Sequence, residues 1–212
     1  MLVDEAHGAH IHLLEDPHFE DALCCGADVV VQSSHKTLSS LSQTAMLHLN
    51  RRAVSYSSDL NCESLARILD RSLSILTSTS PNSLLLASLD AARAQVESCG
   101  KHSMVIALKA VQEIKYLCRQ HPDKVKLLED SEELLRRGLS LDPLRLTLRF
   151  AMKDNQVIDD RICVEDGIYC ELNLKSCITY HMSVYSTKQT LETLTCSLRR
   201  ALQTWDYEEG IR

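Results

Sequence analysis

The feature that most constrains the fold is a run of β-branched residues at 28–32, which reads Asp-Val-Val-Val-Gln. A strand with one face in water alternates apolar and polar residues, whereas an unbroken apolar run of this length is typical of a strand covered on both faces. Strands of this kind belong to sheets that have helices on either side. We therefore expect residues 28–32 to be a buried strand of an α/β domain.

The segments around this run extend the same pattern. Leu2 and Val3 have the character of the end of another buried strand, and residues 43–49 that of a third. Between the first two strands, residues 19–25 are expected to form a short helix that Gly26 closes. Strand, helix and strand in this order predict a largely parallel sheet. Because the chain opens within a strand, we expect it to be a fragment or a truncated gene product.

Residues 61–121 carry the periodicity of three successive helices. The first has an apolar stripe made up of Leu65, Ile68, Leu69, Leu73 and Leu76. For the second, Ser80 suits the N-cap, Pro81 fits the first turn, and Gly100 is expected to end the helix. The third has a stripe made up of Val105, Leu108, Val111, Ile114 and Leu117. It is expected to stop before Pro122.

The periodicity changes after residues 123–137, a charged stretch that we expect to be a connector with a short helix. Residues 144–150 alternate apolar with polar side chains, as a half-buried strand does. Residues 168–172 and 178–184 are expected to form two more strands. Residues 186–189, Ser-Thr-Lys-Gln, fit a capping box. The helix that follows has one apolar side, made up of Leu191, Leu194, Leu198, Ala201, Leu202 and Trp205.

These patterns predict two domains. Residues 1–138 are expected to be part of an α/β domain, including its connecting helices. Residues 139–212 are expected to be a small α+β domain, because strands and helices no longer alternate there.

Composition excludes two classes of partner. The formal net charge is -6, which argues against a nucleic-acid-binding surface, because such a surface needs a basic face. No apolar run approaches the ~18 residues that a membrane span needs. We therefore expect neither nucleic acid nor a membrane as partner.

The cysteines and histidines predict neither disulfides nor a metal site. The nine cysteines are odd in number and include no Cys-x-x-Cys pair. Disulfide frameworks are typical of shorter secreted chains with an even count, so we expect buried, reduced thiols in an intracellular compartment. The cytoplasm fits, as does the plastid stroma if a transit peptide has been lost. His10 and His12 share one side of an extended segment, but no cysteine or carboxylate set accompanies them, so no metal is expected.

Two short segments carry the residues that could do chemistry. Residues 3–10 read Val-Asp-Glu-Ala-His-Gly-Ala-His, and residues 32–37 read Gln-Ser-Ser-His-Lys-Thr. Each follows a predicted strand, and open α/β sheets bind their ligands at the carboxyl ends of strands. We expect both segments to emerge at the same edge of the sheet.

An aspartate at one strand end and a lysine beyond the next strand meet the requirements of pyridoxal phosphate. The amine of Lys36 can form a Schiff base with the cofactor aldehyde. Asp4 can pair with the pyridine nitrogen and keep it protonated, so that the ring accepts the electrons left by a departing carboxylate. Ala6 is small enough for the ring to lie flat against the strand, and Ser33 can reach the phosphate.

The Asp-x-Ala and Ser-x-His-Lys arrangement resembles that of fold-type I pyridoxal-phosphate enzymes. Four stretches are similar to the ornithine/lysine/arginine decarboxylase family, namely VDEAHGAH, GADVVVQSSHKTLSSLSQTAMLH, TSTSPNSLLLASLDAAR and DPLRLTLRFA. The likeness extends from Leu2 to about Trp205, and after Phe150 it rests on pattern more than on identity. It implies part of a large α/β domain of the aspartate-aminotransferase type, followed by a small C-terminal α+β domain.

The resemblance also implies a role for each residue of the two segments. Lys36 would be the catalytic lysine, and His7 would lie near the cofactor ring. Ser33 and His35 would contact the phosphate end of the cofactor. The implied cofactor-binding residues are Asp4, Ala6, His7, Ser33, His35 and Lys36.

The family implies a reaction and an assembly. The α-carboxylate would leave arginine, lysine or ornithine, giving the corresponding amine, as in polyamine biosynthesis, and carbon dioxide. The full-length form would be a homodimer or a higher homo-oligomer, with each site completed by its neighbour.

The chain departs from the family pattern in two places, and these leave other functions open. The loop that cradles the phosphate and the residue that stacks on the ring precede the Asp-x-Ala strand in the family, whereas this chain starts at that strand. After Phe150 the family has a glycine-containing turn, where this chain has Ala151–Gln156, as a deletion or mis-spliced segment would produce. An inactive truncated fragment is one alternative. Another fold-type I enzyme, an acyltransferase or a lyase, is a second, because Asp-Glu-Ala-His also occurs in relatives that condense amino acids with acyl thioesters.

Overall fold

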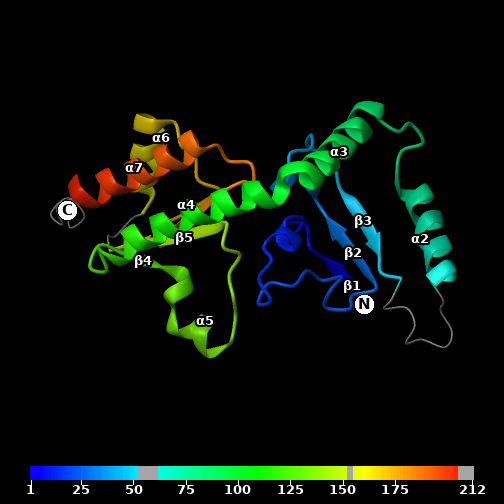
Figure 1. Ribbon diagram of the computed structural model, residues 1–212, viewed down its shortest axis with the longest axis horizontal. Helices are drawn as coiled ribbons and strands as arrows, with labels where there is room; N and C mark the ends of the chain where they lie inside the picture. The colour runs from blue at the N-terminus through cyan, green and yellow to red at the C-terminus, as the bar shows by residue number, and fades with distance from the viewer. Residues whose placement is uncertain (52–61, 152–154, 205–212) are drawn as a thin grey trace. The chain divides into compact units, whose positions relative to one another are not determined.

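The computed structural model describes residues 1–51, 62–151 and 155–204, and it divides into two compact units (Figure 1). The first unit is Met1–Lys101 and the second is His102–Arg212. The units divide earlier in the chain than the predicted domains, because the helix that starts at Lys101 packs with the later strands. The predicted boundary after residue 138 separates domains as an enzyme family defines them, whereas the units are defined by contacts within this chain. The predicted boundary therefore stays a prediction.

The first unit contains a three-stranded sheet in the order β1 (Leu2–Asp4), β2 (Val29–Gln32) and β3 (Met46–Leu49) (Figure 1). β1 and β2 are parallel, with Asp4 opposite Val31, whereas β2 and β3 are antiparallel. All three predicted strands are therefore present. The prediction of a largely parallel sheet holds for one of the two pairings, because the connection between β2 and β3 returns the chain in the opposite direction.

The strands differ in burial according to their place in this sheet. Three of the four residues of β2, the central strand, are buried, as its β-branched run predicts. Leu2 was expected to be buried, but it is 65% exposed. The reason is that β1 is an edge strand in the part of the chain that the structure describes.

The connection from β1 to β2 contains a single turn of 3-10 helix, η1 (Ile11–Leu13), and a series of turns. The helix predicted at residues 19–25 is not formed. The carboxylate of Asp21 accepts a hydrogen bond from the N–H of Cys24 (2.8 Å), so a side chain competes there with helical backbone pairing. Gly26 adopts a φ of 90°, a conformation that favours glycine, and it closes these turns instead of a helix.

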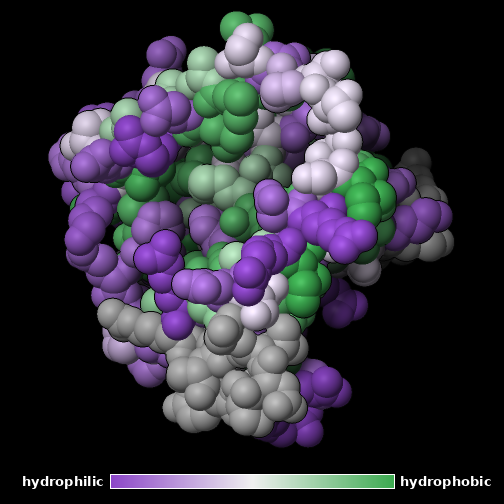
Figure 2. Space-filling view, turned by 90° about the vertical axis from the view of Figure 1, so that its right-hand side faces the viewer, coloured by the Kyte–Doolittle hydropathy of each residue, from purple (hydrophilic) through white to green (hydrophobic). Residues whose placement is uncertain are grey.

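The first predicted helix is present as α2 (Cys62–Leu76), but its apolar stripe is not covered. No residue of α2 is buried, and Ile68, Leu73 and Leu76 are exposed. Figure 2 looks from the side of the chain where α2 lies, and it shows apolar side chains at the surface beside hydrophilic ones.

The second and third predicted helices form one continuous helical run of α3 (Ser83–Gln95), a π-helical turn η3 (Val96–Gly100) and α4 (Lys101–Arg119). Ser80 is not the N-cap, because Asn82 Oδ1 accepts the N–H groups of the first turn at 3.0 and 3.3 Å. Gly100 does not end a helix. A Cβ there would lie 3.3 Å from a methyl carbon of Leu13, so the glycine serves close packing. The predicted stop before Pro122 is confirmed.

The second unit is built on a four-stranded antiparallel sheet in the order β4-β5-β7-β6, of which Figure 1 labels β4 and β5. Its strands are β4 (Val125–Leu127), β5 (Arg145–Phe150), β6 (Leu172–Leu174) and β7 (Cys177–His181). β5 and β7 confirm two predicted strands, and Leu146, Leu148 and Phe150 are buried as the alternation requires. The strand predicted at 168–172 begins only at Leu172. β4 lies in the charged stretch, where only a helix was predicted.

Helices supply the rest of the core of this unit. They are α4, α6 (Gln156–Asp166) and α7 (Lys188–Thr204), whereas the 3-10 turn η4 (Leu128–Asp130) and α5 (Glu132–Arg136), which confirms the connector helix, have no buried residue. Fully or nearly fully buried side chains include Met104, Val111, Ile114, Ile178, Leu194 and Leu198. Thr187 caps α7, since its Oγ1 accepts the N–H of Thr190 (3.2 Å), so the capping box predicted from Ser186 to Gln189 is not formed. Trp205 lies outside the described residues.

Asn155 joins three elements of the second unit at the start of α6, a helix that was not predicted. Its Oδ1 accepts the N–H of Phe150 at the end of β5 (2.7 Å). Its Nδ2 donates to the carbonyl of Lys175, in the turn between β6 and β7 (3.0 Å). Asn155 is 1% exposed, so these bonds lie inside the unit. Residues 152–154, part of the segment that departs from the family pattern, lie outside the described residues.

The cysteines are all free thiols, but they are not all buried. Cys24, Cys25 and Cys196 are exposed and five others are half-buried, so the expectation of burial holds for Cys118 alone. Cys118 is buried, and burial raises the pKa of its thiol to about 12. Among the described helices, none combines the length and the apolar character needed to cross a membrane.

Candidate functional site

The two candidate segments meet where β1 and β2 end. Backbone pairing continues past both strands, because the N–H of Glu5 donates to the carbonyl of Val31 (2.9 Å). One step further, the N–H of Ser33 donates to the carbonyl of Ala6 (3.1 Å). The residues after β1 therefore lie beside those after β2, at one edge of the sheet, as the sequence predicts.

Asp4 places a carboxylate at this edge. It is the last residue of β1, and its side chain is exposed. Oδ1 accepts a hydrogen bond from the N–H of Ala6 (3.0 Å), which fixes the carboxylate beside the small side chain of Ala6. Oδ2 accepts no hydrogen bond from the residues that the structure describes, so it can receive a donor from a bound molecule.

Lys36 lies in the short helix α1 (Ser34–Thr37), directly after β2. Its Nζ is 3.3 Å from Nε2 of His7, and both side chains are exposed. A lysine ammonium can only donate, so this contact is a hydrogen bond when Nε2 of His7 carries no proton. A neutral imidazole in this position can accept a proton from the amine and return it. The structure thus brings together the amine and the imidazole of the two segments.

His35 is held by a backbone acceptor. Its Nδ1 is 2.8 Å from the carbonyl oxygen of Thr44, and because a carbonyl only accepts, Nδ1 carries the proton of this bond. The Thr44 hydroxyl is fixed in turn by Ser40 Oγ (2.6 Å) and by the carbonyl of Leu41 (2.7 Å). The bond at Nδ1 leaves Nε2 of His35 for a ligand.

Three hydroxyl groups surround Lys36 in the sequence. Ser33 is the N-cap residue of α1, yet its side chain makes no capping hydrogen bond. Ser34 and Thr37 are each 1% exposed, and their hydroxyls have no hydrogen-bond partner among the described residues. Buried hydroxyls without a partner are uncommon, because each costs free energy. Neither Ser34 nor Thr37 was singled out from the sequence, since a hydroxyl beside the lysine is marked by no motif.

Glu5 is a third residue that sequence reasoning missed. Its Oε2 accepts a hydrogen bond from Nε2 of Gln32 (2.6 Å), and its Oε1 accepts one from the N–H of Ala22 (2.9 Å). Gln32 is the last residue of β2 and is 6% exposed. The Glu5 carboxylate therefore links the segment after β1 to the end of β2 and to the turns before it.

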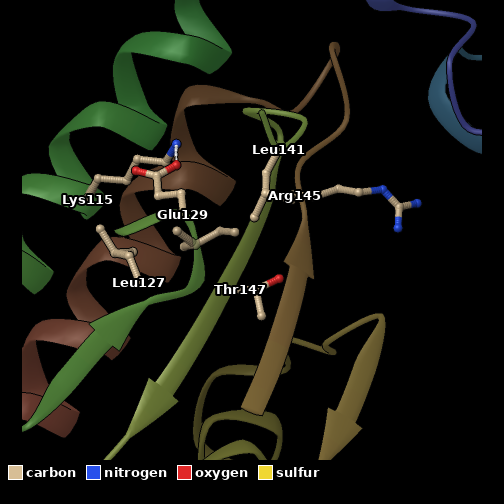
Figure 3. Close-up of a pocket in the computed structure, with 7 residues that line it drawn as sticks. Lys115, Leu127, Glu129, Leu141, Arg145 and Thr147 are labelled. Carbon is tan, nitrogen blue, oxygen red and sulfur yellow. Dashed lines mark hydrogen bonds and ion pairs between the residues drawn. The ribbon is translucent and has the colours of Figure 1, made fainter. Parts of the chain in front are cut away.

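A small pocket in the second unit is a poorer candidate (Figure 3). It holds a cavity of about 10 Å³, which is room for about one water molecule. Figure 3 shows Lys115 reaching from α4 to Glu129, with which it forms an ion pair, while the side chain of Arg145 points away from them. Lys115 is only 5% exposed, so this pairing is part of the core and leaves no group for chemistry.

Comparison with known proteins gives both sequence relatives and a fold. The pattern of the Orn/Lys/Arg decarboxylase major domain matches residues 1–135. An arginine decarboxylase of Bacillus subtilis (strain 168) is 34% identical over 154 residues, which is 70% of this chain and 28% of that protein. The uncharacterized protein YaaO of the same organism is 46% identical over 97 residues, 46% of this chain and 18% of that protein. The chain thus spans less than a third of the length of each of these two relatives.

The lysine decarboxylase LdcF of Francisella novicida has a similar structure. The TM-score is 0.75, with 19% identity, over 95% of this chain and 32% of that chain. At this identity the likeness concerns the fold alone. It confirms the predicted fold class, a partial large α/β domain of the fold-type I enzymes with a small α+β domain after it.

Proposed function

We propose, from the fact that this chain belongs to the Orn/Lys/Arg decarboxylase family, that it carries the catalytic lysine of a pyridoxal-phosphate enzyme that removes the α-carboxylate of arginine, lysine or ornithine. The observation that carries the proposal is the 3.3 Å contact between Lys36 Nζ and His7 Nε2, next to the strand that ends in the Asp4 carboxylate. Because the chain spans only part of its relatives, the activity, the homodimeric or larger assembly and the location of the whole protein, in the cytoplasm or the plastid stroma, belong to the same proposal.

The side chains at this edge fit the cofactor in their chemistry. Lys36 offers an exposed primary amine for a covalent bond to the aldehyde. Asp4 offers a carboxylate with one oxygen already fixed, which can pair with the protonated ring nitrogen. The flat ring would lie over Ala6. The hydroxyl groups around Lys36 and Nε2 of His35 supply donors of the kind that a phosphate needs.

In the proposed mechanism, a proton is transferred between the Lys36 amine and the His7 imidazole. Before the cofactor binds, the Lys36 amine must lose a proton to become a nucleophile, and the neutral His7 ring is placed to accept it. The bound cofactor supplies the electron-withdrawing ring that stabilises the charge left by the departing carboxylate. When the product forms, Lys36 or His7 can return the proton, because their side chains are in contact at this edge of the sheet.

His35 has a defined role in the same mechanism. With Nδ1 donating to the Thr44 carbonyl, Nε2 can donate to a phosphate oxygen only when the ring is protonated on both nitrogens. A cationic His35 would therefore add a positive charge at the phosphate end, where it forms a charge-assisted hydrogen bond.

The test is an absorbance spectrum of the purified chain mixed with pyridoxal phosphate. We expect a visible, near-violet band that borohydride bleaches, with the trapped adduct found by mass spectrometry on the peptide that contains Lys36. The Lys36→Ala variant should lack the band and the adduct. Lys188→Ala, at an exposed lysine of the second unit, is the matched control and should retain both.

Product analysis separates the proposed reaction from its alternatives. Carboxyl-labelled arginine, lysine and ornithine should release labelled carbon dioxide, and a Lys36-dependent band without any release would favour an inactive fragment or another fold-type I reaction. A band of equal strength in Lys36→Ala would overturn the assignment of the cofactor lysine.

A further inference from the structure

The carboxylate of Glu5 receives hydrogen bonds from two elements at once. Gln32 Nε2 donates from the end of β2 (2.6 Å), and the N–H of Ala22 donates from the turns that precede β2 (2.9 Å). A carboxylate suits this position because it is an acceptor at both oxygens, whereas an amide offers one acceptor and one donor. The bond from Gln32 is short, as hydrogen bonds to a charged acceptor are.

Glu5 and Gln32 adjoin the two halves of the candidate site. Glu5 lies between Asp4 and Ala6, and Gln32 directly precedes Ser33 and the lysine segment. Gln32 is buried at 6% exposure, so its amide cannot exchange this partner for bulk water without cost. The hydrogen bond between Glu5 and Gln32 therefore joins the Asp4 segment to the Lys36 segment through their side chains.

Gly8 keeps the space that Glu5 needs. An ideal Cβ on Gly8 would lie 2.3 Å from Cγ and 2.7 Å from Cδ of Glu5, much closer than carbon atoms approach. The N–H of Gly8 also donates to the carbonyl of Glu5 (2.8 Å), which closes the turn after β1. The Glu5 side chain thus lies against Gly8, within the turn that Glu5 begins. Only glycine, which has no side chain, leaves room for it there.

From these contacts we infer that Glu5 is a positioning residue, which fixes Asp4 and Lys36 at the separation the cofactor requires. It acts through Gln32 and touches no reacting atom itself. This inference rests on the proposed function, because a fixed separation of Asp4 and Lys36 matters only if both residues bind the same cofactor molecule.

The experiment exchanges the partners of this hydrogen bond in the full 212-residue chain. Gln32→Glu places a second carboxylate against Glu5, and the two charges repel each other. Glu5→Gln combined with Gln32→Glu restores a donor opposite an acceptor, since the new amide at position 5 can donate to the new carboxylate at position 32 and still accept from the N–H of Ala22. Gln112→Glu, at an exposed residue of α4, is the control for gain of one negative charge.

Two readouts are followed together with the melting temperature. The dissociation constant for pyridoxal phosphate should rise about tenfold or more in Gln32→Glu, the change expected from loss of one charge-assisted hydrogen bond. The exchanged pair should return it to within about threefold of the original value, by the same reasoning. In the cofactor-free chain, the labelling rate of the Lys36 amine relative to that of Lys101 should change in Gln32→Glu and recover in the exchanged pair.

The outcomes separate the two proposals. If the original chain forms no Lys36-dependent band, the proposed function fails, and the relative labelling of Lys36 still tests the role of Glu5. If Gln32→Glu lowers the melting temperature but leaves both Lys36 labelling and cofactor binding unchanged, Glu5 is only a structural residue and the inference is overturned. The inference is also overturned if the exchanged pair restores neither the dissociation constant for pyridoxal phosphate nor the relative labelling rate of Lys36.

Discussion

Replacing Gly8 by alanine is expected to loosen the strand ends at which Asp4 and Lys36 lie. The new Cβ would stand 2.3 Å from Cγ of Glu5. The φ of Gly8 is not in the positive region, so alanine causes no backbone strain there. The cost therefore comes from the displaced Glu5 side chain, which must give up its hydrogen bonds from Gln32 and from Ala22.

The magnitude follows from these two bonds. Hydrogen bonds to a charged group contribute about 1.5–3 kcal/mol each to stability. Glu5 is only half-buried, so water replaces part of what is lost, and we take the lower end of the sum. Gly8→Ala should thus lower the local free energy of unfolding by about 3 kcal/mol.

A double-mutant cycle isolates the clash. In a Glu5→Ala background there is no Glu5 carboxylate to displace, and the nearest remaining atom is the flexible Ile11 Cδ1 at 3.1 Å. Gly8→Ala should then be neutral or stabilising by up to about 1 kcal/mol, since alanine restricts the unfolded chain. The two substitutions are therefore expected to couple by about 3 kcal/mol.

Native-state hydrogen exchange of the β2 amides measures this local free energy, with the β5 amides of the second unit as internal reference. An equal cost of Gly8→Ala in both backgrounds would refute the reasoning, because the cost would then have a source other than Glu5.

Two further predictions concern the second unit. Asn155→Ala removes the acceptor of the Phe150 N–H and the donor to the Lys175 carbonyl, at a buried position, and should cost about 2–4 kcal/mol in urea denaturation; a loss below about 0.5 kcal/mol would contradict the role of this amide. Burial raises the pKa of the Cys118 thiol to about 12 from an ordinary value of about 9, so the unfolded chain releases this proton first, and the stability it contributes is lost as pH rises from about 9 toward 12. Cys118→Ala should make that decline shallower by at most about 1.4 kcal/mol per pH unit, whereas an unchanged slope in denaturation between pH 9 and 11 would contradict it.

Strands were predictable where one physical demand sets the sequence. The Val-Val-Val run of β2 reflects burial on both faces of the strand. The alternation of β5 reflects burial on one face. β4 escaped prediction because three residues, Val-Lys-Leu, are too few to show a period. α6 escaped because its buried residues are only Ile158, Asp159 and Ile162, and the acid among them breaks the apolar stripe.

Helix ends were harder to predict than helices, because several residues compete for the same task. Ser80 and Asn82 are both good caps, and the structure uses Asn82, whose oxygen accepts two N–H groups. Gly100 has the composition of a helix end, yet packing against Leu13 explains the glycine, and a π-helical turn carries the helix through it. Which of two locally adequate solutions occurs depends on contacts from distant parts of the chain.

The candidate site divides in the same way between what a local pattern reveals and what only tertiary contacts create. Alternation along an extended segment places Asp4 and Ala6 on one side and Glu5 on the other. The sequence therefore predicts the pair that would face the proposed cofactor, because the carboxylate and the small side chain are the residue types that the cofactor needs. Glu5 faces the scaffold, and its partners are an amide 27 residues away and a backbone N–H 17 residues away. A backbone N–H leaves no trace in the sequence, so the role of Glu5 becomes visible only when the turns before β2 are in place.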